Sequence, residues 1–477
     1  MRGGEVRRSA LCVIVVGLLV ALPWFAGRPG SAGAVVPCPH SGGRYSALSV
    51  GGSTPSPLNP CPGQEWAKAF GTADYDVSVG VEHTNDGGFV LLVMSSLTPA
   101  TIVRYNVTGT LLWQRSYDRG GAGGFAGAIK QTADGGYVWA SDTNLGGIGG
   151  RDVILYKLDA LGAIAWQTVY GTAGNDDVRT LVVAQDGGYL LAGYTIAPGG
   201  DWDHWVVRVD STGSVLWQKR FGGTVLGSDQ AFTAVGTSDG GFAVGGQVYV
   251  AGSAGPDSWV IRLDSGGNVM WQKVYKFANY LGSLRTTIDG GYVAAGNTNG
   301  KTFVTKLDAN GVILWQKTYG TTGPANIFQT GDGGYVLAAV AKVGKGASAN
   351  NDIEVMNLDV NGAVVWAKTY GGSGEEGMCN GNCLDQALDG TYLVAGYTKS
   401  FGAGSADAWL LKLASNGGIS TSPCPSGIGA NVSPSVATAG LTTSSPSYIE
   451  AITSGSSAAG TATSSLGSLT VATQCSA

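Results

Sequence analysis

The chain has 477 residues and a formal net charge of −5, and 13% of its residues are charged, against roughly a quarter in an average soluble domain. Its 79 glycines follow no three-residue period, which excludes collagen, and its 13 Trp and 19 Tyr exclude a disordered chain. No basic block is present, so we expect neither a nucleic acid nor an anionic membrane surface as a partner.

Residues 1–34 are typical of an export signal. They begin with a basic stretch, continue with an apolar run over 10–26 and end in the small residues 32–34. An uncleaved anchor helix is the competing interpretation, and Pro23 and the shortness of the run argue against it. No other segment is apolar enough to span a membrane. We therefore expect a secreted or cell-surface protein with no membrane span after signal cleavage.

The cysteine count also fits export. Cleavage removes Cys12 and leaves six cysteines, of which the first two lie in an N-terminal segment over 35–63 and flank its Pro/Gly/Ser-rich stretch. Disulfides form in exported proteins, and six cysteines allow 15 connectivities. We prefer nearest-neighbour pairing, which gives Cys38–Cys61, Cys379–Cys383 and Cys424–Cys475. A metal site at Cys379 and Cys383 is the alternative, but it needs two further ligands that are not found nearby.

Residues 64–418 repeat a pattern of about 50 residues. Each unit has a Trp with an aromatic residue four positions later and a D-G-G-aromatic turn. It also has a K-L-D-A-N-G-like turn, in which Gly lies three positions after the Asp or Asn that begins the turn. The tryptophans are Trp66, Trp113, Trp166, Trp217, Trp271, Trp315 and Trp366. The D-G-G turns begin at Asp86, Asp134, Asp186, Asp239, Asp289 and Asp332, with D-G-T-Y at Asp389.

Each landmark belongs to an expected strand. In the unit around residue 200, the strands are VRTLVVAQ from Val178, GGYLLAGYT from Gly187, DHWVVRVD from Asp203 and SVLWQKRF from Ser214. Four short strands per unit, repeated four to eight times, are the signature of a β-propeller blade. Their nearly continuous apolar character fits sheets that are covered on both faces.

Counting the strands predicts seven blades. The array begins with an unaccompanied Trp strand at Trp66 and ends with a K-L-D-type strand over 408–414 that lacks one. We expect the Trp66 strand to complete the final blade, built from residues near 380–414, because closure removes exposed edges. The fold class is therefore all-β: a seven-bladed β-propeller of four-stranded blades, monomeric, with the Trp strand outermost in each blade. A Ser/Thr-rich tail follows.

The repeated residues are interpreted as structural. Seven copies of one Trp and one D-G-G turn cannot all be catalytic, so we expect them to pack and turn the chain. Each Trp is expected to fill the space between blades, where an aromatic side chain buries about 150–250 Å².

The pattern WQKTYG…DGGYVLA…KLDANGVILWQKTYG resembles the D-G-G/Trp β-propeller repeats of many exported and surface proteins of bacteria and archaea, and it covers 64–418 in all seven units. The resemblance implies extracellular binding or surface structure. The tail from Thr421 also looks like the Cys-bracketed tails of such proteins. A second, weaker similarity is to the Trp-docking repeats of quinoprotein dehydrogenases. Those repeats usually carry one more residue between Asp and Gly, and their adjacent Cys-Cys pair is absent here.

Function is sought in residues that do not repeat. The loop at 201–205 holds Asp201, Trp202 and His204, none of which has a counterpart in other units. Trp beside carboxylates could stack on a sugar ring or help to hold Ca²⁺, whereas a solvated loop is the plain alternative. Asp203 and Trp205 do recur in other units, so they are interpreted as structural.

Paired carboxylates recur after the Trp strand, as Asp176-Asp177, Glu375-Glu376, and Asp74 with Asp76. Such pairs raise a glycosidase interpretation. Their recurrence favours a turn or a cation-binding loop instead.

One column of the short strand before D-G-G varies strongly between units. It reads Glu82, Lys130, Val182, Val235, Arg285, Phe328 and Asp385. This variation suits a face that lines the central channel and forms a ligand pocket, although a solvated face on the opposite side fits equally well. His83 is a further residue without a counterpart.

The tail, 419–477, is rich in Ser, Thr, Gly and Ala, and Glu450 is its sole charge. Its composition fits a spacer or a small β appendage, locked if Cys424 and Cys475 pair.

The sequence lacks G-x-S-x-G, H-E-x-x-H, phosphate-loop and EF-hand motifs. Our leading hypothesis is therefore a non-enzymatic exported module that binds a glycan or a surface protein. A polysaccharide lyase or hydrolase is the alternative, and it is favoured if Glu82, His83, Lys130, Arg285 and Asp385 converge on the channel. A quinoprotein-like oxidoreductase is the third. No cofactor is expected apart from Ca²⁺.

Overall fold

The computed structural model describes residues 65–71, 74–95, 100–119, 126–144, 149–196, 200–222, 227–253, 255–278, 280–343, 350–379, 381–402 and 405–419, together with short strands between 429 and 475. The expected signal at 1–34, the segment at 35–63 up to residue 64, and Cys38, Cys61 and Cys424 lie outside these residues. No helix in the described part of the chain is long and apolar enough to cross a membrane.

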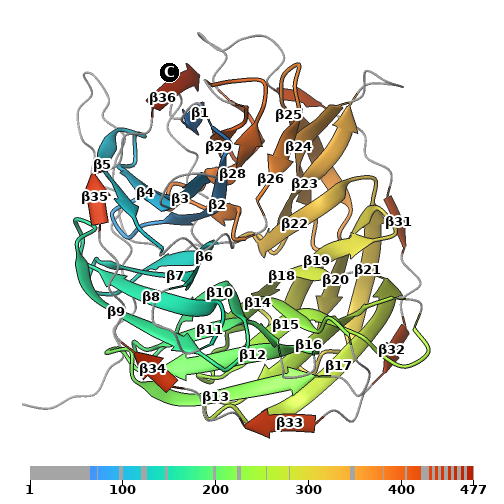
Figure 1. The fold of residues 1–477 in the computed structure, drawn as a ribbon. Helices are drawn as coiled ribbons and strands as arrows, with labels where there is room; N and C mark the ends of the chain where they lie inside the picture. Colours follow the sequence, from blue (N-terminus) through green and yellow to red (C-terminus); the bar gives the residue numbers. More distant parts are fainter. Residues whose placement is uncertain are drawn as a thin grey trace, which may run out of the picture. The chain divides into compact units, whose positions relative to one another are not determined.

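Seven antiparallel sheets form a ring of blades, as predicted (Figure 1). Blade 1 contains β2 (Asp76–His83), β3 (Phe89–Ser95), β4 (Ala100–Tyr105) and β5 (Leu111–Tyr117); blade 2 contains β6 (Ala126–Gln131), β7 (Tyr137–Thr143), β8 (Asp152–Leu158) and β9 (Ile164–Gly171); blade 3 contains β10 (Asp176–Val183), β11 (Tyr189–Ile196), β12 (Trp202–Val209) and β13 (Val215–Gly222); and blade 4 contains β14 (Gln230–Gly236), β15 (Phe242–Val248), β16 (Asp257–Leu263) and β17 (Val269–Ala278).

The remaining three blades follow the same plan. Blade 5 contains β18 (Leu281–Thr286), β19 (Tyr292–Thr298), β20 (Lys301–Leu307) and β21 (Ile313–Tyr319); blade 6 contains β22 (Thr322–Gln329), β23 (Tyr335–Val343), β24 (Asn350–Leu358) and β25 (Val364–Tyr370); and blade 7 contains the split inner strand β26 (Glu376–Met378) and β27 (Leu384–Gln386), followed by β28 (Tyr392–Thr398), β29 (Asp407–Leu413) and β1 (Trp66–Gly71).

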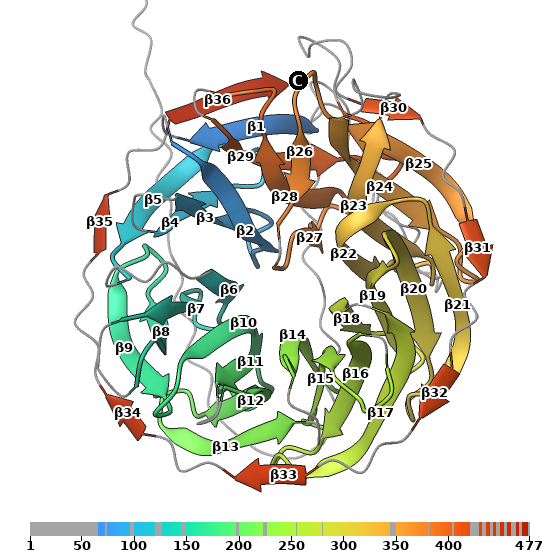
Figure 2. The ribbon, with the colours of Figure 1, turned by 45° about the vertical axis from the view of Figure 1, so that its right-hand side comes forward.

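The predicted closure is confirmed. Strand β1 pairs antiparallel with β29, and Trp66 lies opposite Lys412. The first strand of each blade lies nearest the centre of the ring, as Figure 2 shows for β2, β6, β10, β14, β18, β22 and β27. Side chains of these inner strands are therefore the ones placed to line a central channel, whereas the middle strands are buried between neighbouring blades.

The tail adds a fifth strand to every blade. Its strands are β30 (Gly429–Asn431), β31 (Val436–Thr438), β32 (Thr442–Ser444), β33 (Ile449–Ile452), β34 (Ser456–Ala458), β35 (Ser464–Leu466) and β36 (Thr470–Cys475). They pair in turn with β25, β21, β17, β13, β9, β5 and β1, so the tail runs around the ring against the order of the blades (Figure 2).

The prediction for the outer edge is therefore corrected. The Trp strand is outermost among the four propeller strands, but a tail strand lies outside it in each sheet. The physical reason is that the outer strand still offers unpaired N–H and C=O groups, which a neighbouring strand can satisfy. Where its strands are described, the tail is accordingly β structure added to the outer edges of the blades and not a free spacer.

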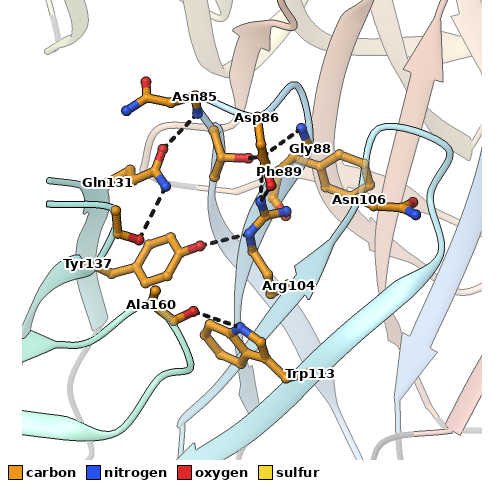
Figure 3. Close-up of polar contacts among 12 residues, drawn as sticks. Asn85, Asp86, Gly88, Phe89, Arg104, Asn106, Trp113, Gln131, Tyr137 and Ala160 are labelled. Atoms are coloured by element: carbon orange, nitrogen blue, oxygen red, sulfur yellow. Dashed lines mark hydrogen bonds and ion pairs between the residues drawn. The ribbon is translucent and has the colours of Figure 1, made fainter. Parts of the chain in front are cut away.

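The repeated residues form one network between adjacent blades, shown for blades 1 and 2 in Figure 3. Arg104 donates from Nη2 to both carboxylate oxygens of Asp86, each at 2.6 Å, and from Nε to the hydroxyl of Tyr137 at 2.7 Å. Asp86 also accepts the N–H of Gly88 at 3.1 Å, which closes the D-G-G turn. A side chain of the K-L-D-type strand thus ties its own turn to the D-G-G tyrosine of the next blade.

The Trp landmark makes a second link between blades. Trp113 donates from Nε1 to the carbonyl of Ala160 in blade 2, at 3.1 Å, and the hydroxyl of Tyr117 donates to the carbonyl of Gly162 at 2.6 Å. Gly162 has φ of +78°, and a Cβ there would lie 2.9 Å from the Trp113 ring. The turn glycine is thus required both by its backbone conformation and by the close approach of the tryptophan.

Candidate functional site

Five charged residues that do not repeat come together at the channel. Glu82 and His83 end β2, Lys130 lies in β6, Arg285 in β18 and Asp385 in β27. Lys130 forms an ion pair with Glu82, and His83 Nδ1 lies 2.8 Å from Asp385 Oδ2. The same Asp385 oxygen accepts the backbone N–H of His83 at 2.8 Å. Blades 1, 2, 5 and 7 thus contribute to one cluster. Of the varied column, Glu82, Lys130, Arg285 and Asp385 lie on the channel side of their strands.

The cluster is partly shielded from water. The side chains of Glu82 and Asp385 are 15% and 22% exposed. The hydrogen bond to Asp385 raises the pKa of His83 against the opposing effect of burial, and burial raises the pKa of Glu82 although Lys130 counteracts it. Burial alone would raise the pKa of Asp385, but the contact with His83 outweighs it and lowers that pKa. The His83–Asp385 pair therefore favours its charged form.

A disulfide loop of blade 7 enters the channel beside this cluster. The predicted Cys379–Cys383 bond is present, and it closes the interruption between β26 and β27. Within the loop, Asn382 donates from its side-chain Nδ2 to the backbone carbonyl of Val81 at 3.0 Å. The backbone carbonyl of Asn382 accepts the N–H of Val81 at 2.8 Å. Gly381 is needed because a Cβ there would collide with the carbonyl oxygen of Val79. The loop is thus seated on the inner strand of blade 1.

Arg285 joins this loop from blade 5, across the ring. Its Nη2 donates to the side-chain oxygen of Asn382, and its Nη1 donates to the carbonyl of Leu284 at 3.2 Å. Burial lowers the pKa of Arg285, and the charges of Asp385 and Glu82 oppose that effect. The guanidinium group stays charged at every relevant pH.

A cavity of about 320 Å³ adjoins these residues. Its lining includes Glu82, Lys130, Arg179, Phe232, Arg285 and Asn382. A neighbouring cavity of about 250 Å³ shares Arg179 and Phe232 and adds Tyr280 and Pro324. The rings of Phe232 and Tyr280 meet edge to face with centroids 5.1 Å apart. Polar and aromatic groups around a concave space are typical of small-ligand sites.

The sequence did not identify Arg179, Phe232, Tyr280 or Asn382 as site residues. Asn382 had a usable signal, because it lies between two cysteines that interrupt the repeat. The other three lie in or beside inner strands but outside the varied column, so the column did not reveal them.

The structure does not bring the residues of the 201–205 loop into this cluster. Asp201 accepts the N–H of Gly227 at 2.9 Å, and Trp202 stacks on Tyr194 with ring centroids 4.8 Å apart. His204 is fully buried. Its Nε2 lies 3.0 Å from the carbonyl of Gln247, and burial lowers its pKa to about 4. These positions suit packing between strands and blades.

The paired carboxylates at 176–177 are engaged by protein groups. Asp176 accepts the N–H of Thr172 at 2.6 Å, while Asp177 forms ion pairs with Arg151 at 3.1 Å and Arg179 at 2.9 Å. Asp142 lies beside them with no solvent exposure, and burial together with the charge of Asp177 raises its pKa to about 8. Sequence analysis did not identify Asp142, which lies near the end of β7.

The other predicted acidic pairs also lie against protein groups. Glu375 pairs with Lys399 at 2.7 Å, and Glu376 accepts the N–H of Gly372 at 3.0 Å. Asp76 is fully buried, whereas Asp74 is partly exposed. Within the described residues, no group of three or more His, Cys, Asp or Glu side chains is arranged to hold a metal ion. A Ca²⁺ site therefore stays a prediction.

No protein-family model matches this chain, and no curated protein does. Among solved structures, it is similar to a protein of unknown function from Dyadobacter fermentans, with 12% identity, a TM-score of 0.40, and coverage of 73% of this chain and 98% of the other. A protein of unknown function from Bacteroides caccae has 14% identity, a TM-score of 0.37, and coverage of 62% and 93%. A luciferin-regenerating enzyme has 11% identity, a TM-score of 0.34, and coverage of 58% and 88%. None of these similarities says what the chain binds or does.

Proposed function

We propose that this protein is a non-enzymatic, exported β-propeller that binds its ligand, a glycan or a segment of a surface protein, in the central channel. One observation carries the proposal. Glu82, His83, Lys130, Arg285 and Asp385 come from four blades to one place, next to a cavity of about 320 Å³. Export itself rests on the sequence of 1–34.

The contrast between repeated and unrepeated residues supports this assignment. The repeated Asp, Arg or Lys, Tyr and Trp residues are occupied in holding blades together, as Arg104 does between Asp86 and Tyr137. The channel residues do not recur, so they are not part of the network that repeats between blades. Residues that differ from the repeat in several blades and lie together are expected to determine which ligand is bound.

A polysaccharide lyase or hydrolase is the second candidate, because the same convergence is what such an enzyme requires. His83 hydrogen-bonds to Asp385 at 2.8 Å, and Glu82 lies beside it with a raised pKa caused first by burial. A carboxyl group with a raised pKa is suited to general-acid catalysis. In this alternative, Arg285 would bind the anionic part of the substrate.

A pull-down on a panel of insoluble polysaccharides separates the two candidates. The purified protein is incubated with each polysaccharide, and the supernatant is assayed for released sugars. Binding without release supports the binding module, and release of sugars supports the enzyme. If neither occurs, the glycan branch of the proposal is wrong, and a protein ligand is tested next by cross-linking on cells.

The residues to substitute in that assay are in the channel. Glu82→Gln with Lys130→Met removes one ion pair without changing the net charge of the protein. We expect this double variant to lose binding. The matched control is Glu375→Gln with Lys399→Met, which removes an exposed ion pair outside the channel cluster and should bind like the parent protein.

A further inference from the structure

We propose that the channel site binds a carboxylate-bearing ring, with Arg285 holding the carboxylate and the Phe232–Tyr280 pair forming the wall against which the ring packs. This inference rests on the proposed function, because it names the ligand class of the same channel. A uronic acid residue and an aromatic acid share this chemistry.

The charge balance of the channel supports an anionic ligand. Glu82 is paired with Lys130 and Asp385 with His83, so while His83 is protonated the two carboxylates of the cluster each have a cationic partner. Arg285 differs from them. Its hydrogen bonds go to two neutral acceptors, the carbonyl of Leu284 and the side-chain oxygen of Asn382. Among the described residues, no carboxylate accepts a hydrogen bond from it.

A guanidinium held this way is prepared for a carboxylate. It has five N–H donors in a planar fork, which matches the two oxygens of a carboxylate. Asn382 and the Leu284 carbonyl fix the side chain before a ligand arrives, which lowers the entropy cost of binding. The surrounding cavity is partly closed to water, so a charge-assisted hydrogen bond there is stronger than at the surface.

The wall of the cavity suits a ring. Phe232 lines both cavities, and Tyr280 and Pro324 line the second of them. Gly282 and Gly381 also line the space, and the absence of side chains at these two positions keeps it open. Aromatic faces stack on sugar and aromatic rings alike, so the geometry selects the carboxylate more strongly than the kind of ring.

His83 adds a dependence on pH. The charged groups that face it are Asp385, Glu82 and Lys130, and Arg285 interacts with the same two carboxylates. With His83 neutral, two cations balance the two carboxylates, and with His83 protonated the cluster carries one excess positive charge. Anion binding should therefore strengthen as the pH falls through the raised pKa of His83, and weaken again only where the ligand carboxylate itself takes up a proton.

The test is saturation-transfer NMR with matched probes at pH 6.0. D-Glucuronate is compared with D-glucose, and benzoate with benzyl alcohol. We expect at least one acid to bind ten-fold or more tightly than its neutral match, and the pair that shows this effect identifies the kind of ring. We also expect Arg285→Met to reduce binding of that acid by ten-fold or more, and Arg285→Lys to reduce it by less.

Controls separate this inference from the proposed function. Arg115→Met, on the outer strand β5, removes the same charge away from the channel and should bind like the parent protein. Equal binding of acid and neutral probes overturns the inference, as does acid binding that survives Arg285→Met or an absence of binding by all four probes. The polysaccharide panel tests the proposed function separately. If the protein binds a neutral glycan, and Glu82→Gln with Lys130→Met abolishes that binding, the proposed function stands even though the preference for a carboxylate is wrong. Circular dichroism shows whether each variant is folded. If Arg285→Met does not fold, the comparison of Arg285→Lys with the parent protein still tests the inference.

Discussion

Removal of one hydroxyl group, in Tyr137→Phe, tests whether the repeated residues hold the blades together. Tyr137 and Arg104 are 2% and 3% exposed, and the Tyr137 hydroxyl accepts a hydrogen bond from Arg104 Nε at 2.7 Å. Phenylalanine keeps the ring and its packing but leaves a buried guanidinium N–H without this acceptor. A hydrogen bond to a charged group contributes about 1.5–3 kcal/mol, so we expect the free energy of unfolding to fall by about 2 kcal/mol.

Differential scanning calorimetry measures this effect. The unfolding entropy is roughly 2.1 cal/mol/K per residue, and the ring spans about 350 residues between Trp66 and Leu413. A loss of about 2 kcal/mol therefore lowers Tm by about 3 °C. The control is Tyr105→Phe. Tyr105 is fully buried, and within the described part of the chain its hydroxyl has no hydrogen-bond partner, so its removal should leave Tm unchanged or raise it slightly.

Equal Tm shifts for the two variants would contradict this expectation. They would mean that loss of a phenolic hydroxyl acts through general packing and that the link from Arg104 to Tyr137 contributes little. A larger loss in Tyr105→Phe would contradict it more strongly.

Three further predictions address the channel loop, a buried acid and the tail. Gly381→Ala should weaken ligand binding because a Cβ would collide with Val79, whereas Gly331→Ala, which has open space around its Cβ position, should not; titration calorimetry compares them. The pKa of Asp142 is about 8 against an ordinary 3.8, so the folded state retains a proton that the unfolded state releases, and stability falls as the pH rises between about 4 and 8. Asp142→Asn should remove this slope in urea unfolding from pH 5 to 9, and an unchanged slope would contradict the assignment. Peptide mapping by mass spectrometry under non-reducing conditions should find Cys424 joined to Cys475, and any other partner for either cysteine disproves that pairing.

The sequence predicted the ring because each blade repeats the same physical solution. The Trp always lies seven residues after the first residue of the K-L-D-A-N-G-like turn, as Trp113 follows Asn106, and this constant spacing defines a hairpin. An unpaired Trp66 strand at one end of the array requires a partner at the other. The channel column was predicted for a related reason. Glu82, Lys130, Arg285 and Asp385 occupy one position of a short strand whose neighbours repeat, so their variation was visible.

What the sequence could not predict depends on contacts between distant segments. The hydrogen bond from Arg285 to Asn382 joins residues 97 positions apart, and although each residue stands out locally, no local pattern pairs them. The raised pKa of Asp142 arises from burial beside Asp177, which comes from the next blade. The tail strands are mostly three residues long and lack apolar alternation, because they obtain their order from the edges of finished blades.

The most direct test of the central claim compares one repeated and one unrepeated residue in the same two assays. Tm and retention on the bound polysaccharide are measured for Tyr137→Phe and for Glu82→Gln with Lys130→Met. We expect Tyr137→Phe to lower Tm by about 3 °C and to keep binding. We expect the channel variant to lose binding and to keep its Tm within about 1 °C of the parent, because both members of the shielded pair are removed together. Loss of binding in Tyr137→Phe at a temperature where it is folded, or full binding by the channel variant, would contradict the assignment of structure to the repeat and of function to the channel.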